Sequence, residues 1–361
     1  MKLVKRMATL FLALILAVGM TSCSSGSNDT TWAIKSGDDV ISTELYLSQL
    51  FFTFSSLYND YYSYGYDPTS FFDQTVGEQA MSEYIIDYAQ STSKESLAIR
   101  QWMRELGIET SAEELESNQK AAEQSYATNA DYLTEMGITR EHLLTYYEDD
   151  AAFRTLFNYI YGEGGEKGIS LDELKNDFYE NNYRAEIFYV PLIDSSGNLL
   201  SEEEQQAIKD RVDGYVKELN EEGATFASIR EKEVEITPSV ATTMEDTAGY
   251  LSKDDVYEED LLSTTIANLE EGKAAAFTYN EDYYILTQKM PIRSTETDKH
   301  VTDQQFSLRY SMMSEDYLAA IDARVAGMKF DLNDAVLKKY DPKTFVEGIS
   351  GSGSSSTTAS N

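Results

Sequence analysis

The sequence predicts an α+β protein in which a helical domain is interrupted by a smaller domain of mixed helices and strands. Two observations support this: residues 41–181 show helical apolar spacing almost throughout, and strand-like runs begin at Tyr183. A last helical stretch starts near Asp303 and has too little surface to fold alone. We therefore expect it to return to the first helical domain, which makes that domain discontinuous.

The predicted organisation has six parts. They are a signal segment at 1–22, a lipidated cysteine with a flexible tether at 23–31, a helical domain at 32–182, an inserted domain at 183–291, a returning helix and strand at 292–347, and a disordered tail at 348–361.

The leader is basic and then apolar, and it stops at the only cysteine, Cys23. Lys2, Lys5 and Arg6 precede an apolar run at 8–18 that is too short to span a bilayer. Met20-Thr21-Ser22-Cys23 resembles the lipobox of bacterial lipoproteins, in which the cysteine is acylated. We expect an extracytoplasmic protein that is lipid-anchored to the bacterial cell membrane; the alternative is an ordinary signal peptide that leaves Cys23 as a free thiol.

The composition excludes several functions. The chain has 63 acidic and 29 basic residues, a net charge of −34, so we expect no nucleic-acid partner. One cysteine allows no disulfide within the chain. His142 and His300 are the only histidines, which leaves no set for a His-rich metal site, and we expect both to be solvated. No cofactor or metal is expected; weak calcium binding at acidic clusters such as 258–260 is the alternative to a solvated face.

The helical domain should open with two short strands at 32–41 around a turn at 36–38, after which Ser42 caps a helix. Thr75 and Glu78 match a capping box for a second helix that ends near Gly107. Three more helices are predicted to start at Ser111, Gly137 and Ser170.

The sequence pattern of the inserted domain predicts the element order β-α-α-β-α-β-β. Its segments are a strand at 185–192, helices at 202–222 and from 223, a strand at 249–251, a helix at 258–269 and a hairpin at 276–286. After a polar linker that holds His300, a helix from Asp303 to Gly327 and a strand at 328–332 complete the chain.

The first long helix carries more aromatic side chains than one buried stripe needs. The candidates for a surface that binds unfolded chains are Phe51, Phe52, Phe54, Tyr58, Tyr61 and Tyr62. The alternative is that the stripe is core and the tyrosines form a crowded loop.

The layout resembles the SurA/PrsA-type foldases, in which a helical chaperone domain is interrupted by a parvulin-type peptidyl-prolyl isomerase domain. The segments that carry the resemblance are Trp32–Leu45, Leu106–Leu115, Gly137–Glu141, Gly223–Ile229 and Thr247–Leu286. The resemblance implies a fold with an inserted parvulin-like domain and unfolded or partly folded secreted polypeptides as partners.

The resemblance also identifies where an isomerase centre would lie. Parvulins carry a histidine in the first strand, where this chain has Ile187, and another in the last hairpin strand, where it has Tyr284. The apolar pocket positions fall near Glu258 and Leu262. We expect a membrane-anchored chaperone whose isomerase centre is lost. The alternatives are a slow but active isomerase and a non-chaperone surface-binding lipoprotein.

Overall fold

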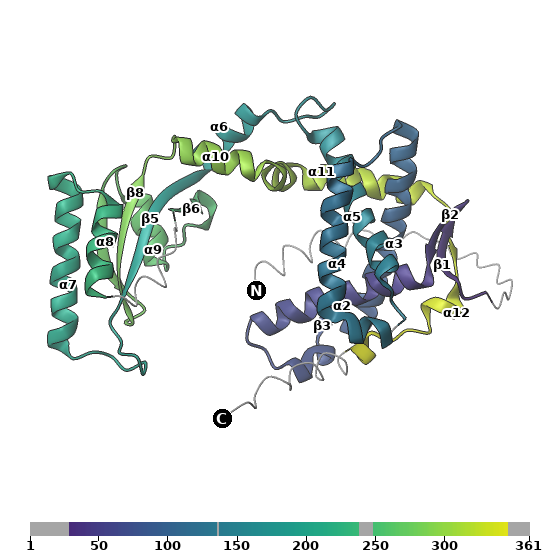
Figure 1. Ribbon diagram of the computed structural model, residues 1–361, viewed down its shortest axis with the longest axis horizontal. Helices are drawn as coiled ribbons and strands as arrows, with labels where there is room; N and C mark the ends of the chain where they lie inside the picture. The colour runs from purple at the N-terminus through teal and green to yellow at the C-terminus, as the bar shows by residue number, and fades with distance from the viewer. Residues whose placement is uncertain (1–28, 136, 238–247, 346–361) are drawn as a thin grey trace. The chain divides into compact units, whose positions relative to one another are not determined.

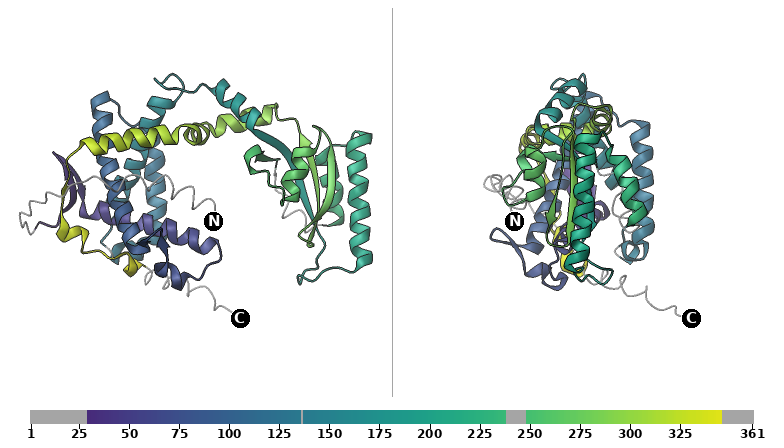
Figure 2. Two further views of the ribbon diagram at one scale, coloured as in Figure 1. Left: turned by 180° about the vertical axis from the view of Figure 1, so that it is seen from behind. Right: turned by 90° about the vertical axis from the view of Figure 1, so that its left-hand side faces the viewer.

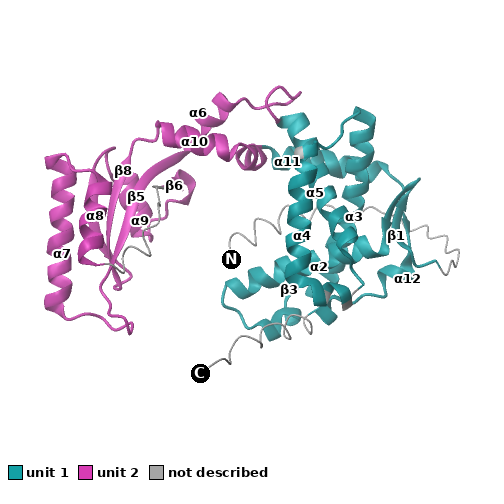
Figure 3. Ribbon diagram, viewed as in Figure 1, with its two compact units in different colours: residues 1–161, 313–361 teal, residues 162–312 magenta. Residues whose placement is uncertain are grey.

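The computed structural model describes residues 29–135, 137–237 and 248–345, and they form two compact units (Figures 1 and 3). Unit 1 combines residues up to Tyr161 with those from Met313 onward, and unit 2 is residues 162–312. The predicted signal segment, Cys23 with most of the tether, and the predicted disordered tail lie outside the described residues. Within the described ranges, no helix is both long enough and apolar enough to cross a membrane.

Unit 1 is mainly helical, with one small three-stranded sheet. Its elements are β1 (Trp32–Ser36), β2 (Asp39–Ser42), α2 (Thr43–Ser63), η1 (Pro68–Asp73), β3 (Thr75–Val76), β4 (Gln79–Ala80), α3 (Met81–Leu106), α4 (Ala112–Glu135), α5 (Arg140–Tyr161), the C-terminal part of α11 (Gln305–Gly327), β9 (Asp331–Leu332), α12 (Asp334–Leu337) and η5 (Pro342–Thr344). The helices α2, α3 and α5 contact one another and enclose most of the core.

Local signals in the sequence place several helix ends correctly. The Ser42 hydroxyl accepts a hydrogen bond from the Leu45 N–H at 3.1 Å, which caps α2 as predicted. The helix α3 ends at Gly107, whose φ of 66° lies in the left-handed region that glycine adopts without strain. In unit 2, a helix starts at Ser170 as predicted, and Ser170 forms a capping box with Glu173 at the start of α6 (Leu171–Asn181).

The capping box predicted at Thr75 and Glu78 is wrong. Thr75–Val76 and Gln79–Ala80 instead pair as a short antiparallel hairpin, and α3 begins only at Met81. Gly77, with φ of 65°, makes the tight turn between these strands. A threonine followed three residues later by a glutamate therefore marks a hairpin here, because the glycine between them favours the turn.

The far end of the chain completes unit 1. Strand β9 pairs antiparallel with β1, with Ile34 opposite Leu332. The side-chain amide of Asn333 donates to the backbone oxygens of Asp29 and Trp32, both at 2.8 Å. The Asn333 backbone N–H donates to the Ala33 backbone oxygen at 2.9 Å. The returning segment thus docks on the N-terminal strands, as expected for a discontinuous domain.

Aromatic side chains hold the last long helix against α5. Tyr317 of α11 is fully buried, and its O–H donates to the backbone oxygen of Phe153 at 2.8 Å. The Tyr161 O–H donates to the Asp316 carboxylate at 2.6 Å. Burial of a side chain as large as Tyr317 removes enough apolar surface to stabilise the unit by about 2–3 kcal/mol.

Unit 2 is an α+β module built on a four-stranded antiparallel sheet of order β6-β5-β8-β7. Its elements are α6 (Leu171–Asn181), β5 (Asn182–Pro191), α7 (Glu202–Lys217), the π turn η2 (Glu218–Glu222), α8 (Phe226–Ile236), β6 (Ala248–Ser252), η4 (Lys253–Asp255), α9 (Leu261–Asn268), β7 (Ala274–Tyr279), β8 (Tyr283–Met290), α10 (Thr295–Asp303) and the start of α11. From β5 to β8 the order β-α-α-β-α-β-β matches the sequence prediction.

The two faces of this sheet are covered by different helices. Phe188, Val190 and Leu286 point to the face where α7 and α8 bury Val212 and Ile229 with them. The other face is covered by α9, which contacts β5, β7 and β8 (Figures 1 and 2). We call these the α7/α8 face and the α9 face.

The units divide elsewhere than the boundaries expected from the sequence. The expected insertion began at Tyr183 and ended at Pro291, whereas unit 2 also contains α6 and α10. These two helices pack together through Leu174, Phe178 and Val301, all of them buried, so they belong to the same core. The helix α10 also replaces most of the polar linker predicted before Asp303.

A pair of desolvated carboxyl groups gives unit 1 a testable pH dependence. Burial raises the pKa of Glu95 in α3, and the charge of Asp322 in α11 raises it further, although the Ser91 hydroxyl opposes the shift. Burial raises the pKa of Asp322 as well. A carboxyl with a raised folded pKa stabilises the fold fully below its unfolded pKa and loses that contribution as the pH rises.

We therefore expect Glu95→Gln to gain stability relative to the wild type as the pH rises from about 4 to 7. Both tryptophans, Trp32 and Trp102, lie in unit 1, so denaturant unfolding followed by their fluorescence reports on this unit. Glu109→Gln, at an exposed site after α3, is the matched control and should leave the pH profile unchanged. A stability difference for Glu95→Gln that is constant across this range would contradict the argument.

Candidate functional site

The two residues that the sequence places in one isomerase-like centre lie on opposite faces of the sheet. In the β5–β8 register, Ile187 is opposite Thr287 and Val190 is opposite Tyr284. Residues opposite each other in an antiparallel pair share a face, and neighbours along a strand alternate. Ile187 therefore points to the α9 face and Tyr284 to the α7/α8 face. The two residues therefore do not form one centre as predicted, because a shift of a single position along a strand exchanges its two faces.

Tyr284 has a structural role on its own face. Its side chain is 8% exposed, and its O–H donates to the Asp213 carboxylate of α7 at 2.8 Å. Burial, together with this hydrogen bond to a carboxylate, raises the pKa of Tyr284 to about 12. The residue thus ties α7 to β8, with its phenol held protonated.

The α9 face presents little acid–base chemistry around Ile187. Its cross-strand partner Thr287 is fully buried, and among the described residues nothing hydrogen-bonds its hydroxyl. Gly249 of β6 lies beside Ile187: a side-chain β-carbon at that glycine would come within 3.9 Å of the Ile187 Cδ1 atom. Neither histidine lies on these strands. The side chain directly opposite Ile187 is thus a neutral hydroxyl, which supplies no general acid or base at neutral pH. The same face also carries Tyr189 and Lys289, each two residues further along its strand, and the Lys289 ammonium donates to the Ala267 backbone oxygen of α9 at 3.0 Å.

The two positions predicted for the apolar pocket, Glu258 and Leu262, differ in their exposure. Leu262 is half-buried in the first turn of α9, whereas Glu258 is exposed in the turn before it. The neighbouring Asp260 caps α9, since its carboxylate accepts the N–H groups of Leu262 and Ser263 at 3.2 Å each. Within the ranges that the structure describes, no group of three acidic, histidine or cysteine side chains could hold a metal ion.

The histidines occupy different environments. His142 lies near the start of α5, where its Nδ1 atom is 3.1 Å from the Thr139 backbone N–H. His300 was expected in a solvated linker, but it lies in α10 and stacks on Tyr250 with ring centroids 4.3 Å apart. Burial lowers the pKa of His300, and the charge of Asp303 opposes this. His300 is half-buried because α10 packs against α6.

Half of the predicted client-binding aromatics are core. Phe51, Phe54 and Tyr58 are at most 8% exposed and belong to the main cluster of unit 1. Phe345 from the returning segment packs on both phenylalanines, with ring centroids 6.1 Å and 5.5 Å away. These three residues are corrected from surface to core: the returning segment covers Phe51 and Phe54, and Tyr58 packs on Phe71 of η1 at 5.4 Å.

The other three candidates differ in exposure. Phe52 is half-buried and stacks on Tyr146 of α5 at 4.5 Å. Tyr61 is also half-buried, with its hydroxyl 2.8 Å from that of Ser70. Tyr62 is 64% exposed, so of the six it is the one that the structure leaves largely open to solvent.

Tyr62 belongs to a group of exposed tyrosines at the end of α2, which we call the tyrosine cluster: Tyr62, Tyr64 and Tyr66. Tyr64 and Tyr66 are 61% and 53% exposed. Tyr66 also stacks on Tyr61, with ring centroids 4.9 Å apart. The helix end at Tyr64-Gly65 was the signal in the sequence for this cluster. Beyond it the chain no longer follows the helical repeat that places side chains in the core. Exposed aromatic side chains of this kind suit adaptable contacts with apolar chains.

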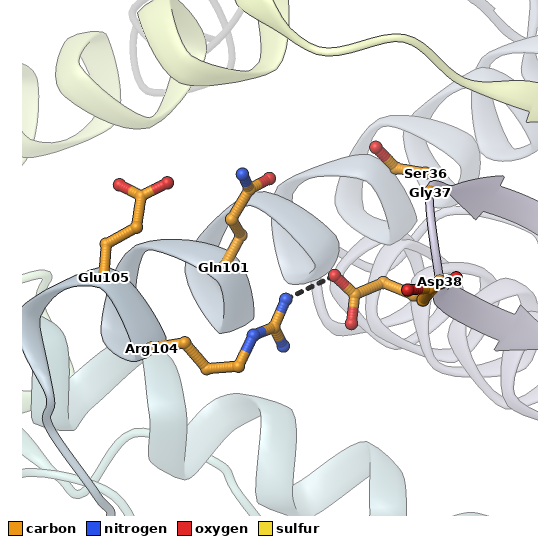
Figure 4. A pocket seen from close by; sticks show the side chains of 7 residues that line it. Ser36, Gly37, Asp38, Gln101, Arg104 and Glu105 are labelled. Atoms are coloured by element: carbon orange, nitrogen blue, oxygen red, sulfur yellow. Dashed lines mark hydrogen bonds and ion pairs between the residues drawn. The ribbon is translucent and has the colours of Figure 1, made fainter.

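A recess of about 790 Å³ lies between the β1–β2 turn and α3 (Figure 4). It is lined by polar side chains, and the dashed line in Figure 4 marks the ion pair between Arg104 of α3 and Asp39. Both partners are partly exposed, so this pair contributes little stability. Arg104 pairs with Asp39, and Glu105 accepts from Arg324, so the recess presents no distinct arrangement of groups for a ligand.

Comparison with solved structures finds a class of proteins described as foldases and peptidylprolyl isomerases. The chain is similar to the foldase protein PrsA of Streptococcus pneumoniae, with a TM-score of 0.37 and 12% identity over 69% of this chain and 86% of that one. PrsA of Bacillus subtilis gives 0.28 and 15% over 74% and 91%, and the peptidylprolyl isomerase PrsA of Bacillus anthracis gives 0.24 and 14% over 66% and 97%. No protein-family model matches the chain, and no curated protein does.

Proposed function

We propose that the chain is a membrane-anchored, extracytoplasmic chaperone for secreted or surface proteins, and that its inserted domain has lost the isomerase centre. The observation that carries this proposal is the inserted module, whose element order matches the parvulin-like domain implied by the sequence resemblance. The helical unit that this module interrupts in sequence is closed by the far end of the chain, as the same resemblance implies.

The α9 face supports the loss of isomerase chemistry. Rotation about a peptide bond faces a barrier of about 18–20 kcal/mol, and catalysis requires groups that bind the twisted form better than the planar one. Ile187 cannot donate a hydrogen bond, and Tyr284 is turned to the other face and engaged with Asp213. The buried Thr287 hydroxyl and the Lys289 ammonium on the same face favour the alternative, a slow isomerase.

The tyrosine cluster supports a role in binding unfolded chains. Three aromatic side chains more than half exposed within five residues form an apolar surface with polar tips. Such a surface binds many sequences weakly, and a chaperone that must release its clients needs weak contacts. The negative charge of the chain favours clients with basic or neutral segments over acidic ones.

The tyrosine cluster predicts a client-binding defect when it is removed. The triple variant Tyr62→Ser, Tyr64→Ser and Tyr66→Ser should weaken binding to an unfolding client roughly tenfold, while stability changes by less than about 0.5 kcal/mol. Suppression of aggregation of a reduced, unfolding client measures the effect. The control carries Tyr159→Ser and Tyr257→Ser, which remove two other exposed tyrosines. Equal protection by both variants would remove the cluster from the proposal; no protection by the wild type would favour a surface-binding lipoprotein without chaperone activity.

Loss of the isomerase centre predicts that the protein does not accelerate prolyl isomerisation. Cis–trans isomerisation of a proline peptide in the presence of the chain from residue 24 onward should proceed at the uncatalysed rate. A rate that rises with protein concentration and disappears in Thr287→Val would instead establish the slow isomerase, with the buried hydroxyl as its polar group.

The anchor predicts a change of location. Cys23→Ser should release the protein from membranes into the soluble fraction, because several acyl chains at about 0.8 kcal/mol per methylene hold the wild type there. Fractionation followed by immunodetection measures this, with Ser24→Ala as the control. Sedimentation of Cys23→Ser with membranes would contradict the anchor.

A further inference from the structure

The strand β7 lies at the edge of the unit 2 sheet, paired with β8 on one side only. The outer side of an edge strand presents backbone N–H and C=O groups that can pair with another chain. Natural edges are usually protected by lysine, proline or a bulge within the strand. The six residues Ala274–Tyr279 contain none of the charged residues or proline that would protect it.

One side chain already pairs with this edge as a neighbouring strand would. The Asn220 side-chain amide accepts from the Ala274 N–H at 2.9 Å and donates to the Ala274 oxygen at 3.0 Å. Both backbone groups of Ala274 therefore point away from β8. Because backbone direction alternates along a strand, Ala276 and Thr278 also point their N–H and C=O groups outward. Among the described residues, none hydrogen-bonds these four groups.

Asn220 also marks where an added strand would end. It occupies the edge at Ala274, so the open segment begins beyond it and runs from Ala276 to Thr278. Thr278 is exposed, and Phe277 is half-buried, so an arriving strand meets open backbone with apolar surface beside it. An added strand of a few residues fits this length.

The charges at both ends of β7 decide between possible occupants. Glu270 and Glu271 precede the strand, and Glu281 and Asp282 follow it, all exposed. Two basic residues lie near the first acidic pair. The Lys273 ammonium donates to the Asn220 backbone oxygen at 3.4 Å, and the Lys289 ammonium, near Glu271, donates to the Ala267 backbone oxygen at 3.0 Å. A second copy of this edge would bring acidic ends against acidic ends in either strand direction. A segment that is uncharged in its centre and basic at its ends is complementary instead.

We propose that the open edge of β7 binds extended, uncharged polypeptide segments with basic flanks by strand addition. Backbone hydrogen bonds supply sequence-tolerant affinity in this mode, and the flanking charges select among segments. That these segments come from unfolded secreted chains rests on the proposed function. The edge thus gives the inserted domain a peptide site that needs no isomerase centre.

The test measures binding of the full chain from residue 24 to a fluorescent peptide of alternating threonine and valine with a lysine pair at each end. Ala276→Pro removes one outward N–H, and because that group makes no bond within the sheet, an edge tolerates the proline. Ala276→Ser, which keeps the N–H, is the matched control. We expect Ala276→Pro to weaken binding about tenfold, Ala276→Ser to leave it unchanged, and added salt to weaken it.

A second comparison does not depend on the variant folding. The same peptide, N-methylated at every threonine and valine, has no backbone N–H donors in its centre, so it cannot form the ladder and should bind much more weakly. A peptide with glutamate in place of lysine should bind more weakly. Equal binding of the methylated peptide, or unchanged binding by a folded Ala276→Pro, would overturn the proposal. Self-association that Ala276→Pro abolishes would overturn it in favour of a second copy.

The outcome separates this inference from the proposed function. If the wild type suppresses aggregation but Ala276→Pro binds the peptide normally, the edge is not the peptide site and the chaperone proposal stands. If the peptide binds in the expected pattern but the wild type protects no client, strand addition stands and the chaperone proposal fails.

Discussion

Unit 1 depends on a strand that arrives from the opposite end of the chain. The Asn333 amide bonds the backbone of Asp29 and Trp32, and β9 extends the β1–β2 hairpin by one strand. The entropy of closing so long a loop grows only with the logarithm of its length, so an insertion of unit 2's size adds little cost. This holds provided that unit 2 folds on its own core, and the buried cluster between its sheet and the helices α7 and α8 supplies one. The closure then places Phe345 against α2, which decides that Phe51 and Phe54 are core and not surface.

In unit 2 the controlling constraint is the two-residue period of a strand. That period sends Phe188 and Val190 to the α7/α8 face and Ile187 to the α9 face, and the β8 register does the same for Tyr284 and Thr287. Two side chains can form one centre only if they share a face. Two residues of β8 lie near Ile187 on its face, Thr287 and Ile285, and both are fully buried. The apolar character of this face therefore follows from the register as well as from the residue at 187.

The sequence predicted what depends on local signals and missed what depends on tertiary pairing. Ser42 and Ser170 cap their helices through contacts within four residues, and these were predictable. Thr75 satisfies the same local rule, yet the hairpin around Gly77 prevails there. The helix α10 was missed because its segment is almost wholly polar, with Thr297 and Val301 as its buried residues. The face of Tyr284 and the burial of Phe51 depend on partners far away in the sequence, which spacing cannot reveal.

Buried polar contacts in unit 2 join the helices α7 and α8 to each other and to the sheet. Glu233 of α8 is fully buried and receives two hydrogen bonds from Arg211 of α7 at 2.9 Å, and others from Tyr215 and Thr237. A buried charge is tolerable only when paired this completely, since loss of one partner costs about 3–5 kcal/mol. With Tyr284 bound to Asp213, these contacts fix both helices on one face of the sheet. The opposite face and the β7 edge carry no comparable network among the described residues. The buried polar pairs of the module thus lie where α7 and α8 pack on the sheet, and what the module offers to other molecules lies in its surfaces and open backbone.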